Sequence, residues 1–226
     1  MKLTYMGHSA FYIEAGGCKL LIDPFLKNNP QCSIGPENLP HIDYILVTHG
    51  HSDHLGDTID IARMFSSTVI CNYEISLYLD RYNIECHSMH IGGSFEFAFG
   101  KVKMTPALHG SSILDGNHVI PGGNPGGFII SSEGKNIYHA GDTGLSMEMQ
   151  LLRDAGIDYA LLPIGGNFTM DIPDASKAVE FIRPKVVIPM HYDTFPLIKS
   201  EPERFAEAVS GICSVEILKP MQCIEI

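Results

Sequence analysis

Hydrophobic and polar positions in the first third of the chain predict short β-strands separated by glycine-containing turns. Apolar runs of four to eight residues that are bounded by Gly, Pro, Asn or Asp are typical of strands. The predicted strands cover residues 3–6, 11–14, 19–23, 44–48 and 68–71. The chain is therefore expected to begin with a β-sheet.

Apolar positions repeat with helical spacing in four later segments. Side chains at i, i+3, i+4 and i+7 share one face of a helix, so this spacing predicts amphipathic helices. It occurs in residues 58–65, 75–82, 175–182 and 205–212. Asp174 is the predicted N-cap of the third helix, and Ser200 with Glu203 forms a predicted capping box before the fourth.

The second half of the chain alternates strands with helices. A hairpin is predicted for residues 96–107, with its turn at Gly100 and Lys101. Further strands are predicted for residues 127–131, 136–140, 159–163 and 186–190, with a helix near residues 145–155. In both halves of the chain, consecutive strands are followed by alternating strands and helices. This order predicts an α/β fold of two packed sheets with helices outside. Because no linker, repeat or low-complexity tract interrupts the chain, we expect one domain over residues 1–226.

One connection, residues 110–126, is unusually long and is rich in glycine and proline near its end. Loops longer than about 12 residues are often functional lids. This loop is therefore a candidate cover for a substrate pocket, with a surface excursion or a subunit contact as the alternatives.

Composition narrows the choice of partners. The chain has 226 residues, of which 45% are hydrophobic and 18% charged, as in packed globular proteins. Its 15 Lys and Arg residues against 26 Asp and Glu residues give a net charge of −11, and no basic cluster occurs. This balance disfavours a nucleic-acid partner, which would require concentrated positive charge.

The N-terminal sequence, the length of the apolar runs and the cysteines predict the cellular location of the protein. No signal-peptide pattern begins the sequence, and no apolar run approaches the ~18 residues of a membrane span, so we expect a soluble cytoplasmic protein without a membrane partner. Six cysteines lie far apart without a C-x-x-C pair. Free, buried thiols in a reducing compartment are the expectation.

The strongest chemical signal is the segment Thr48-His49-Gly50-His51-Ser52-Asp53-His54, which follows a predicted strand. Chance would produce this ordered pattern on the order of 10⁻³ times in a chain of this composition. Imidazole and carboxylate groups suit Zn²⁺, Mn²⁺, Fe²⁺ or Ni²⁺. Because alternate side chains of a short loop face opposite sides, His49 and His51 would face one ion, and Asp53 and His54 a second.

Four ligands cannot complete two sites, so further ligands are expected at other strand ends. His109, Asp142 and His191 each follow an apolar run that delivers them to such a position. Each residue alone could be a hydrogen-bonded structural residue. Together with the loop they predict a two-metal site.

Three more residues are expected around this site. Asp23, at a strand end, is a candidate to accept the second N–H of a metal-bound imidazole, with turn capping as the alternative. His8 could contact substrate, bind a metal directly, or make a structural hydrogen bond at the end of the first strand. His139 is expected to support the site from behind or to be structural, and not to be a ligand.

The predicted site suggests a mechanism. Two ions ~3.5 to 4 Å apart can hold a bridging water, lower its pKa and present hydroxide to a carbonyl or phosphoryl group. Asp53 could also accept or return a proton, so its ligand and general-base roles both stay open. No Ser or Cys nucleophile is needed.

The metal motif together with residues 7–11, 21–24, 163–170 and 190–194 resembles the metallo-β-lactamase superfamily, and within it a prokaryotic family of uncharacterised metal-dependent hydrolases related to ascorbate 6-phosphate lactonase. The resemblance implies a four-layer αββα sandwich with a dinuclear site at one edge of the sheets. It implies the following ligand sets: His49, His51 and His109 on the first metal, Asp53, His54 and His191 on the second, and Asp142 bridging.

Two positions depart from the relatives, and others predict the pocket. Position 51 is His and not the Glu of flavin-linked diiron relatives, which argues against redox chemistry, and Gly166 stands where an acidic residue is expected. Asn167 and Phe168 are predicted to form a pocket wall opposite the 110–126 loop, with core packing of Phe168 as the alternative. His118, within that loop, is a candidate substrate contact.

The predicted function is hydrolysis of an ester, lactone or phosphodiester of a small molecule with two divalent ions, preferably Zn²⁺. Mn²⁺, Fe²⁺ and Ni²⁺ are the alternatives, and a homo-oligomer is possible. A metal-dependent ribonuclease or phosphodiesterase acting on nucleic acid is a competing function. A non-catalytic, metal-stabilised ligand sensor is the third.

Overall fold

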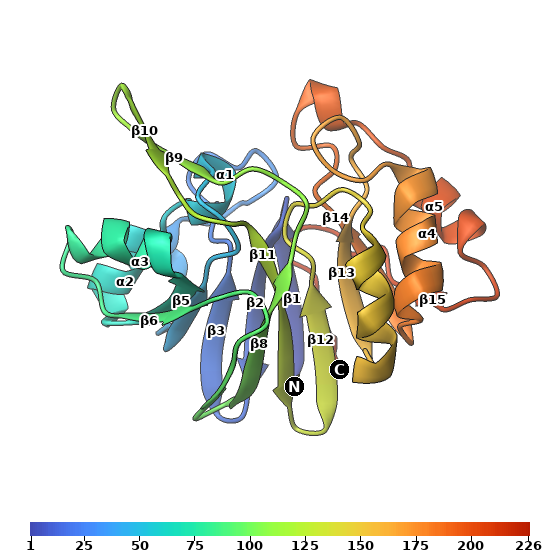
Figure 1. Ribbon diagram of the computed structural model, residues 1–226, viewed down its shortest axis with the longest axis horizontal. Helices are drawn as coiled ribbons and strands as arrows, with labels where there is room; N and C mark the ends of the chain where they lie inside the picture. Colours follow the sequence, from blue (N-terminus) through green and yellow to red (C-terminus); the bar gives the residue numbers. More distant parts are fainter.

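Two seven-stranded β-sheets face each other in the computed structural model, which describes residues 1–226 (Figure 1). The first sheet has the order β16-β1-β2-β3-β4-β5-β6. Its strands are β1 (Lys2–Gly7), β2 (Ala10–Ala15), β3 (Cys18–Ile22), β4 (Tyr44–Leu46), β5 (Thr68–Asn72), β6 (Cys86–Met89) and β16 (Cys223–Glu225).

The second sheet has the order β15-β14-β13-β12-β11-β8-β7. Its strands are β7 (Ser94–Phe97), β8 (Gly100–Pro106), β11 (Gly126–Ser132), β12 (Lys135–His139), β13 (Tyr159–Pro163), β14 (Val186–Met190) and β15 (Ser214–Val215). All of the strands predicted from the sequence overlap strands of the two sheets.

Helices cover the outer faces of both sheets (Figure 1). The helical segments are α1 (Ser52–Leu55), α2 (Thr58–Phe65), α3 (Tyr73–Asp80), α4 (Ile172–Ile182), α5 (Pro202–Ala208) and the 3₁₀ segments η1 (Pro36–Asn38), η2 (Met147–Ala155) and η3 (Pro196–Ile198). The helices α2 and α3 lie on the first sheet, and α4, α5 and η2 lie on the second. The predicted αββα layering is confirmed.

Alternation along the central strands produces two cores. In β3, Leu20 and Ile22 belong to a cluster of 38 buried residues that fills the space between the sheets and continues to α4 and α5. Leu21, between them in sequence, belongs to a second cluster of 18 buried residues under α2 and α3. Successive side chains of a strand point to opposite faces, so one strand contributes to both cores.

Several local predictions were wrong at element ends. The hairpin of β7 and β8 turns before Gly100, since β8 begins at that residue. Asp171, and not Asp174, caps α4: its side chain accepts the backbone N–H of Asp174. The predicted capping box of Ser200 does not form, because α5 begins at Pro202 without a side-chain cap.

The long 110–126 connection is not an unstructured loop, which corrects the sequence-based prediction. It contains a two-stranded antiparallel hairpin, β9 (Ser112–Asp115) and β10 (His118–Pro121). Ile113 anchors this hairpin in the second core with 1% of its surface exposed. Leu114 and the residue opposite it, Val119, are 68% and 72% exposed.

Strand direction brings the predicted ligands to one edge. In the first sheet, β3 and β4 are parallel, and β1 runs in the same direction because two antiparallel pairings through β2 separate it from β3. In the second sheet, β8 and β12 run in one direction because two antiparallel pairings through β11 separate them. β14 shares that direction, because it is linked to β12 through parallel pairings with β13. The segments that follow these strands therefore meet at one end of the molecule, where Figure 1 shows α1 and the β9–β10 hairpin. The two termini lie toward the opposite end.

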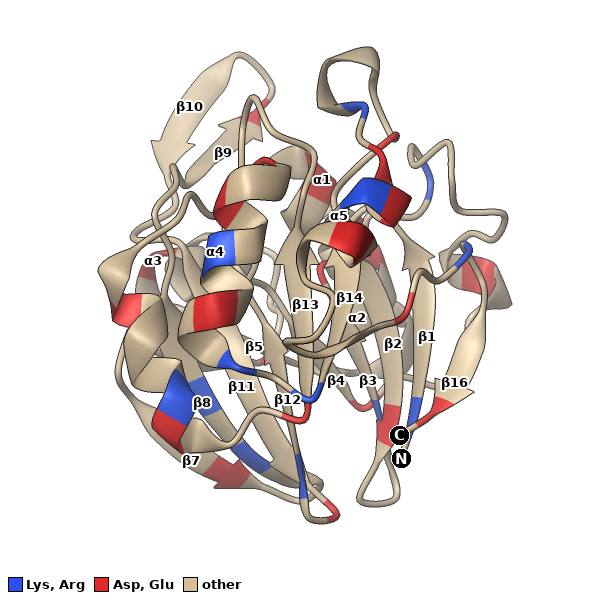
Figure 2. Cartoon of the chain, turned by 90° about the vertical axis from the view of Figure 1, so that its right-hand side faces the viewer, with Lys and Arg blue, Asp and Glu red and all other residues tan.

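Surface charge, helix length and cysteine burial each relate to a prediction made from the sequence. On the face that Figure 2 turns toward the viewer, basic residues are interspersed with acidic ones and form no patch. None of the helices has the length and apolar character that a bilayer span requires. All six cysteines are free, but only Cys71 is buried and Cys223 is exposed, so the expectation of buried thiols was wrong for most of them.

Candidate metal centre

The segments after five strands, β1, β4, β8, β12 and β14, bring potential metal donors together in three overlapping groups. Within each group the donor atoms lie within 4.8 Å of one another. The three-histidine group consists of His49, His51 and His109; the mixed group consists of His8, Asp53, His54 and His191; and a third group joins His49 and His54 to Asp142. All seven predicted ligands and His8 therefore lie in one cluster.

Asp142 lies between the two larger groups. One of its carboxylate oxygens is 3.0 Å from His191 Nε2 and 3.6 Å from His109 Nε2, and the other is 3.3 Å from His54 Nε2. His109 belongs to the three-histidine group, and the other two histidines belong to the mixed group. A single carboxylate can therefore reach donors of both groups.

Unpartnered polar atoms test whether these residues fit a metal. His54 Nε2, His191 Nδ1 and Asp142 Oδ1 are buried and have no hydrogen-bond partner. Buried polar atoms without partners are costly, and a bound cation would satisfy them. The donor set also consists of imidazole nitrogens and carboxylate oxygens, which transition-metal ions accept. The residues therefore fit one or two divalent metal ions.

Asp23 orients two of the histidines. Its Oδ2 atom is 2.8 Å from His54 Nδ1 and accepts the Thr48 hydroxyl at 2.7 Å, and its Oδ1 accepts the Thr48 backbone N–H at 2.8 Å. Since the only hydroxyl proton of Thr48 goes to Asp23, Thr48 Oγ1 accepts from His49 Nδ1 at 3.0 Å. Both imidazoles then keep a proton on Nδ1, so Nε2 is the ring nitrogen that would face a metal ion.

Burial sets the charge of most of the histidines. It lowers the pKa of His8 to about 4 and also lowers the pKa values of His49, His51 and His109. Burial opposes the charge on His54 too, but Asp142 and Asp23 outweigh it and raise the pKa of His54 well above its ordinary value. The imidazoles whose pKa values are lowered are therefore neutral near pH 7, and the neutral imidazole is the form that binds metals. They are His8, His49, His51 and His109.

The two carboxylates stay ionised despite burial. Burial opposes the charge on Asp142, but the neighbouring His54 and His191 hold its pKa well below the ordinary value. Burial also opposes the charge on Asp53, but the hydrogen bond with His8 and the charge interactions with His54 and His8 together outweigh this effect and lower its pKa. The Asp53 side chain is 27% exposed, so it lies where the centre opens to solvent.

His139 has a different environment from the clustered histidines. The backbone N–H of Gly141 donates to its Nδ1 at 3.1 Å, and its Nε2 donates to the Ser9 carbonyl at 2.9 Å. It contacts no metal-donor side chain through these bonds, so the structure favours the structural interpretation. His139 joins the β1–β2 turn to the end of β12, which precedes Asp142.

The predicted pocket residues lie outside the donor groups. Phe168 is 53% exposed, so it is not a core residue, and Asn167 beside it is exposed with a left-handed backbone. Their turn lies against the Asp142 segment, because the Met170 N–H donates to the Thr143 carbonyl at 3.0 Å. His118 is exposed on the β9–β10 hairpin opposite Asp115. The substrate roles of all three stay predictions.

Sequence reasoning missed the residues that hold the ligands in place. Thr48, Thr194 and Gln31 make hydrogen bonds to ligand-bearing segments, but hydroxyl and amide side chains of this kind are common in loops. The position of Thr48 directly before the first histidine was the one available signal. Thr194 follows His191 by three residues and carried no signal of its own.

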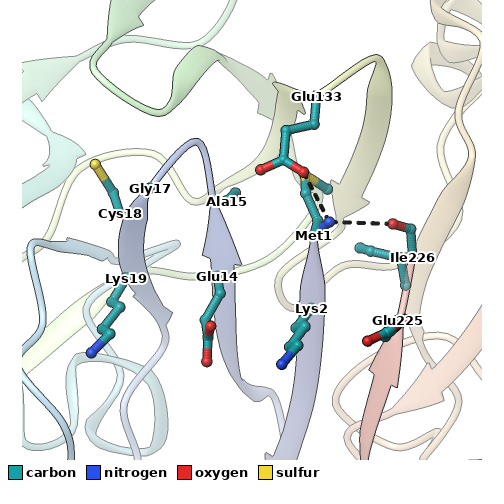
Figure 3. Close-up of a pocket in the computed structure, with 10 residues that line it drawn as sticks. All are labelled: Met1, Lys2, Glu14, Ala15, Gly17, Cys18, Lys19, Glu133, Glu225 and Ile226. Atoms are coloured by element: carbon teal, nitrogen blue, oxygen red, sulfur yellow. Dashed lines mark hydrogen bonds and ion pairs between the residues drawn. The ribbon is translucent and has the colours of Figure 1, made fainter.

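Two cavities lie at different distances from the candidate metal centre. A groove of about 250 Å³ lies beside the metal loop, with the lining residues Phe25, Asn28, Gly50, Ser52, Leu55, Gly56, Asp57, Ile59, Tyr78, Ile113 and Leu114. A larger cavity of about 440 Å³ lies among the chain termini (Figure 3). There the Met1 ammonium donates to Glu133 at 2.9 Å, and Glu133 accepts the Gly16 N–H at 2.8 Å. None of the predicted site residues lines that larger cavity.

Comparison with known proteins agrees with the predicted fold and with metal dependence. Residues 2–191 match the family described as the beta-lactamase superfamily domain. A UPF0173 metal-dependent hydrolase of Alkaliphilus metalliredigens is 58% identical over 216 residues, which cover 92% of this chain and 93% of the relative. A relative of the same name from Carboxydothermus hydrogenoformans is 48% identical and covers 99% of each chain.

A solved structure gives the same result. Igni18, a novel metallo hydrolase from the hyperthermophilic archaeon Ignicoccus hospitalis, superposes with a TM-score of 0.90 at 37% sequence identity, covering 99% of this chain and 97% of Igni18. The match extends over both sheets and all of the ligand-bearing segments. The chain therefore belongs to the beta-lactamase superfamily and, within it, to the UPF0173 metal-dependent hydrolases.

Proposed function

We propose that this metal-dependent hydrolase uses two divalent ions to cleave an ester, lactone or phosphodiester of a small molecule. The observation that carries the proposal is the position of Asp142. Its carboxylate lies within 3.6 Å of His109 in the three-histidine group and within 3.3 Å of His54 and His191 in the mixed group. Two donor sets that share one carboxylate favour two adjacent ions over one.

The donor groups and Asp53 would have different roles in this reaction. Ions bound at such a pair of sites lower the pKa of water and polarise a carbonyl or phosphoryl oxygen. The three-histidine group and the mixed group would hold them, with Zn²⁺ the best match to a histidine-rich set and Mn²⁺, Fe²⁺ or Ni²⁺ as alternatives. Asp53, ionised and partly exposed, is placed to bind an ion and to accept or return a proton.

Surface charge and the neighbouring groove support a small substrate. The net charge of −11 and the interspersed basic residues in Figure 2 provide no cationic track for a nucleic acid. The groove beside the metal loop contains six hydrophobic residues and neither Lys nor Arg. These features favour a small ester or lactone with an uncharged substituent.

A substrate panel tests the proposal. Purified protein loaded with Zn²⁺ or Mn²⁺ is assayed on p-nitrophenyl esters, bis-p-nitrophenyl phosphate, lactones and labelled RNA. We expect turnover of at least one small substrate and none of RNA. Cleavage of RNA alone would replace the small-molecule proposal by a nuclease, and metal binding without any turnover would favour a ligand sensor.

Ligand variants connect that turnover to the centre. His51→Ala or Asp142→Ala should lower kcat/KM by several orders of magnitude, because each removes a donor from a group that has no spare ligand. His41→Ala is the matched control, since His41 is exposed and lies outside all three groups. Activity near wild type in either ligand variant would place the chemistry elsewhere.

A further inference from the structure

The geometry points to a metal-binding role for His8: we propose that it is the fourth protein donor of the mixed group and that Thr194 is the positioning residue that aims its ring. The inference rests on the two-ion centre proposed above. It makes the two ion positions unequal, because the mixed group then offers four protein donors and the three-histidine group three, while Asp142 lies within reach of both.

His8 is placed as a ligand would be. Its side chain is fully buried, and its Nε2 atom is 3.2 Å from Asp53 Oδ2. Its ring centroid lies 4.1 Å from that of His191 and 5.6 Å from that of His54. All four donor atoms lie within 4.8 Å of one another, so one ion could contact them together.

Thr194 determines which ring nitrogen can face the ion. Its Oγ1 atom is 2.8 Å from His8 Nδ1, and its hydroxyl donates to the Tyr192 carbonyl at 3.4 Å. A threonine hydroxyl has one proton, so while it donates to Tyr192 it accepts from His8 Nδ1–H. With the proton on Nδ1, the lone pair of His8 Nε2 faces Asp53, and a bound cation would then replace the hydrogen bond between these two side chains; this is the tautomer that metal coordination requires.

The backbone of His8 is held in an uncommon conformation. Its φ of 57° lies in the left-handed region, which costs free energy for a residue other than glycine. Three hydrogen bonds hold it there: the His8 N–H donates to Gln31 Oε1 at 2.8 Å, and the His8 carbonyl accepts from the His191 N–H at 2.7 Å and from the Tyr5 hydroxyl at 3.2 Å. One of the hydrogen bonds that stabilise this backbone conformation comes from His191, a member of the same mixed group.

His139 shows what a structural histidine looks like in this fold. It is as buried as His8, but both of its ring nitrogens are hydrogen-bonded to backbone groups. His8 faces a carboxylate and two imidazoles that belong to the donor groups. This contrast within one chain supports ligation over a hydrogen-bonding role for His8.

Unequal donor sets have a chemical consequence. If Asp142 is counted for both ions, the mixed group would supply five protein donors and the three-histidine group four, so the ion of the three-histidine group would keep one more coordination position for water or substrate. We therefore place the substrate at the ion of the three-histidine group and expect the ion of the mixed group to bind more tightly. Thr194 would act on the ion of the mixed group only through His8.

Metal titration of hydroxyl variants tests the inference. Thr194→Val keeps the shape of the side chain and removes the hydroxyl, and it should weaken one of two Zn²⁺ or Co²⁺ affinities by roughly 10 to 100-fold. Thr194→Ser should restore that affinity. Thr58→Val is the control, because Thr58 is also buried but its hydroxyl has no partner and lies on α2. A role in packing alone would not be rescued by serine.

Replacement of His8 completes the test. His8→Asn is chosen because asparagine tolerates the left-handed backbone, and far-UV circular dichroism verifies that it folds. We expect it to lose the tighter of two ions, seen by elemental analysis after dialysis and as a changed visible absorption of the Co²⁺ form. Two ions bound with wild-type affinity in both His8→Asn and Thr194→Val would overturn the inference. A wild-type protein that binds one ion at most would instead contradict the two-ion function proposed above.

Discussion

The buried carboxylate of Asp23 shows how a residue that binds no metal can control the centre. It accepts one hydrogen bond from His54 and two from Thr48, and Thr48 in turn accepts one from His49. Histidines of two different donor groups therefore depend on one side chain. Loss of a partner of this kind typically lowers metal affinity or activity without removing a ligand.

Asp23→Asn should lower metal affinity and kcat/KM by roughly 10 to 100-fold. An amide offers one acceptor oxygen instead of two, so its NH₂ group would face either the Thr48 N–H or His54 Nδ1–H and remove that hydrogen bond. Metal titration and steady-state kinetics measure the effect. Asp158→Asn is the matched control, since Asp158 is also buried but bonds to Asn136 and Lys185. Equal effects of both variants on metal affinity would contradict the role of Asp23.

Asp158 also gives a prediction for stability at acid pH. Burial opposes its charge, but the hydrogen bonds from Lys185 and from the Asn136 N–H outweigh burial and lower its pKa. A carboxyl with a depressed folded-state pKa stabilises the protein above its unfolded-state pKa of about 3.9, and this contribution disappears as the pH falls through the folded-state pKa. Urea unfolding should show Asp158→Asn to be less stable than wild type at neutral pH, with a smaller difference in acid. A difference independent of pH would contradict this interpretation.

Among the elements, the β9–β10 hairpin departs most from the prediction. Its strands have four residues each, and only Ile113 is fully buried, so alternation over so short a length gave little signal. The hairpin lies against the metal loop: a methyl group added at Gly50 would lie 2.7 Å from Ile113 Cγ1. The hairpin and the loop that carries His49 and His51 therefore pack as a unit.

Gly50→Ala should separate these two elements. The added methyl group must displace Ile113 or the metal loop, which we expect to cost about 1 to 3 kcal/mol of stability and to weaken metal binding by the three-histidine group. Denaturant unfolding and metal titration measure the two effects. Gly144→Ala is the control, because its added methyl group meets Leu108 at an ordinary 3.7 Å. Unchanged stability and affinity in Gly50→Ala would show that the contact relaxes freely.

The hairpin is also the candidate cover of the substrate pocket. Replacing residues 113–119 with a short Gly/Ser linker should raise KM and lower kcat while metal content stays unchanged. Because the replacement also removes the buried Ile113, a second variant is needed: Leu114→Ser with Val119→Ser changes only exposed side chains and should leave stability within about 0.5 kcal/mol. A higher KM in both variants supports a cover. Unchanged kinetics in both would assign the hairpin to the surface or to a subunit interface.

At the scale of the whole molecule, the two cores are large compared with the metal centre. They contain 38 and 18 buried hydrophobic residues and include none of the donor residues. A core of this size can support the fold without metal. Bound ions add stability in proportion to their affinity, because they bind the folded chain.

Removal of metal should therefore lower the melting temperature but leave the chain folded. After treatment with a chelator, we expect an unchanged far-UV circular dichroism spectrum and a lower Tm that recovers when Zn²⁺ is added back. Circular dichroism and calorimetry on the same sample provide the measurement. Loss of secondary structure without metal would mean that the centre has a structural role beyond catalysis.

Local sequence was sufficient for the central strands, three helices and the metal motif. Strands such as β3 alternate their buried faces along the chain, and α2 follows its apolar spacing over residues 58–65 as predicted. His49, His51, Asp53 and His54 lie in one short segment, so their spacing alone indicated a metal. The family match agrees with the predicted fold and with metal dependence.

Weakly patterned elements could not be found in this way. The edge strands β15 and β16 have two and three residues without a fully buried side chain. Backbone pairing with a neighbour, and not an apolar pattern, makes them strands. The cap of α4 was placed at Asp174 and not at Asp171 because both residues are aspartates, and only the backbone path decides which one caps the helix.

The sequence by itself determined which residues are candidate metal donors, because donor side chains and apolar strands are encoded locally. Only the tertiary structure decided how those donors are grouped and oriented. His8 and Thr194 are 186 residues apart, and Asp23 and His54 are 31 residues apart, yet each pair lies at 2.8 Å. These contacts depend on parallel strands that end at one edge of two different sheets. Hydrogen bonds formed across that edge orient the rings of His8 and His54, and sequence spacing contains no record of them.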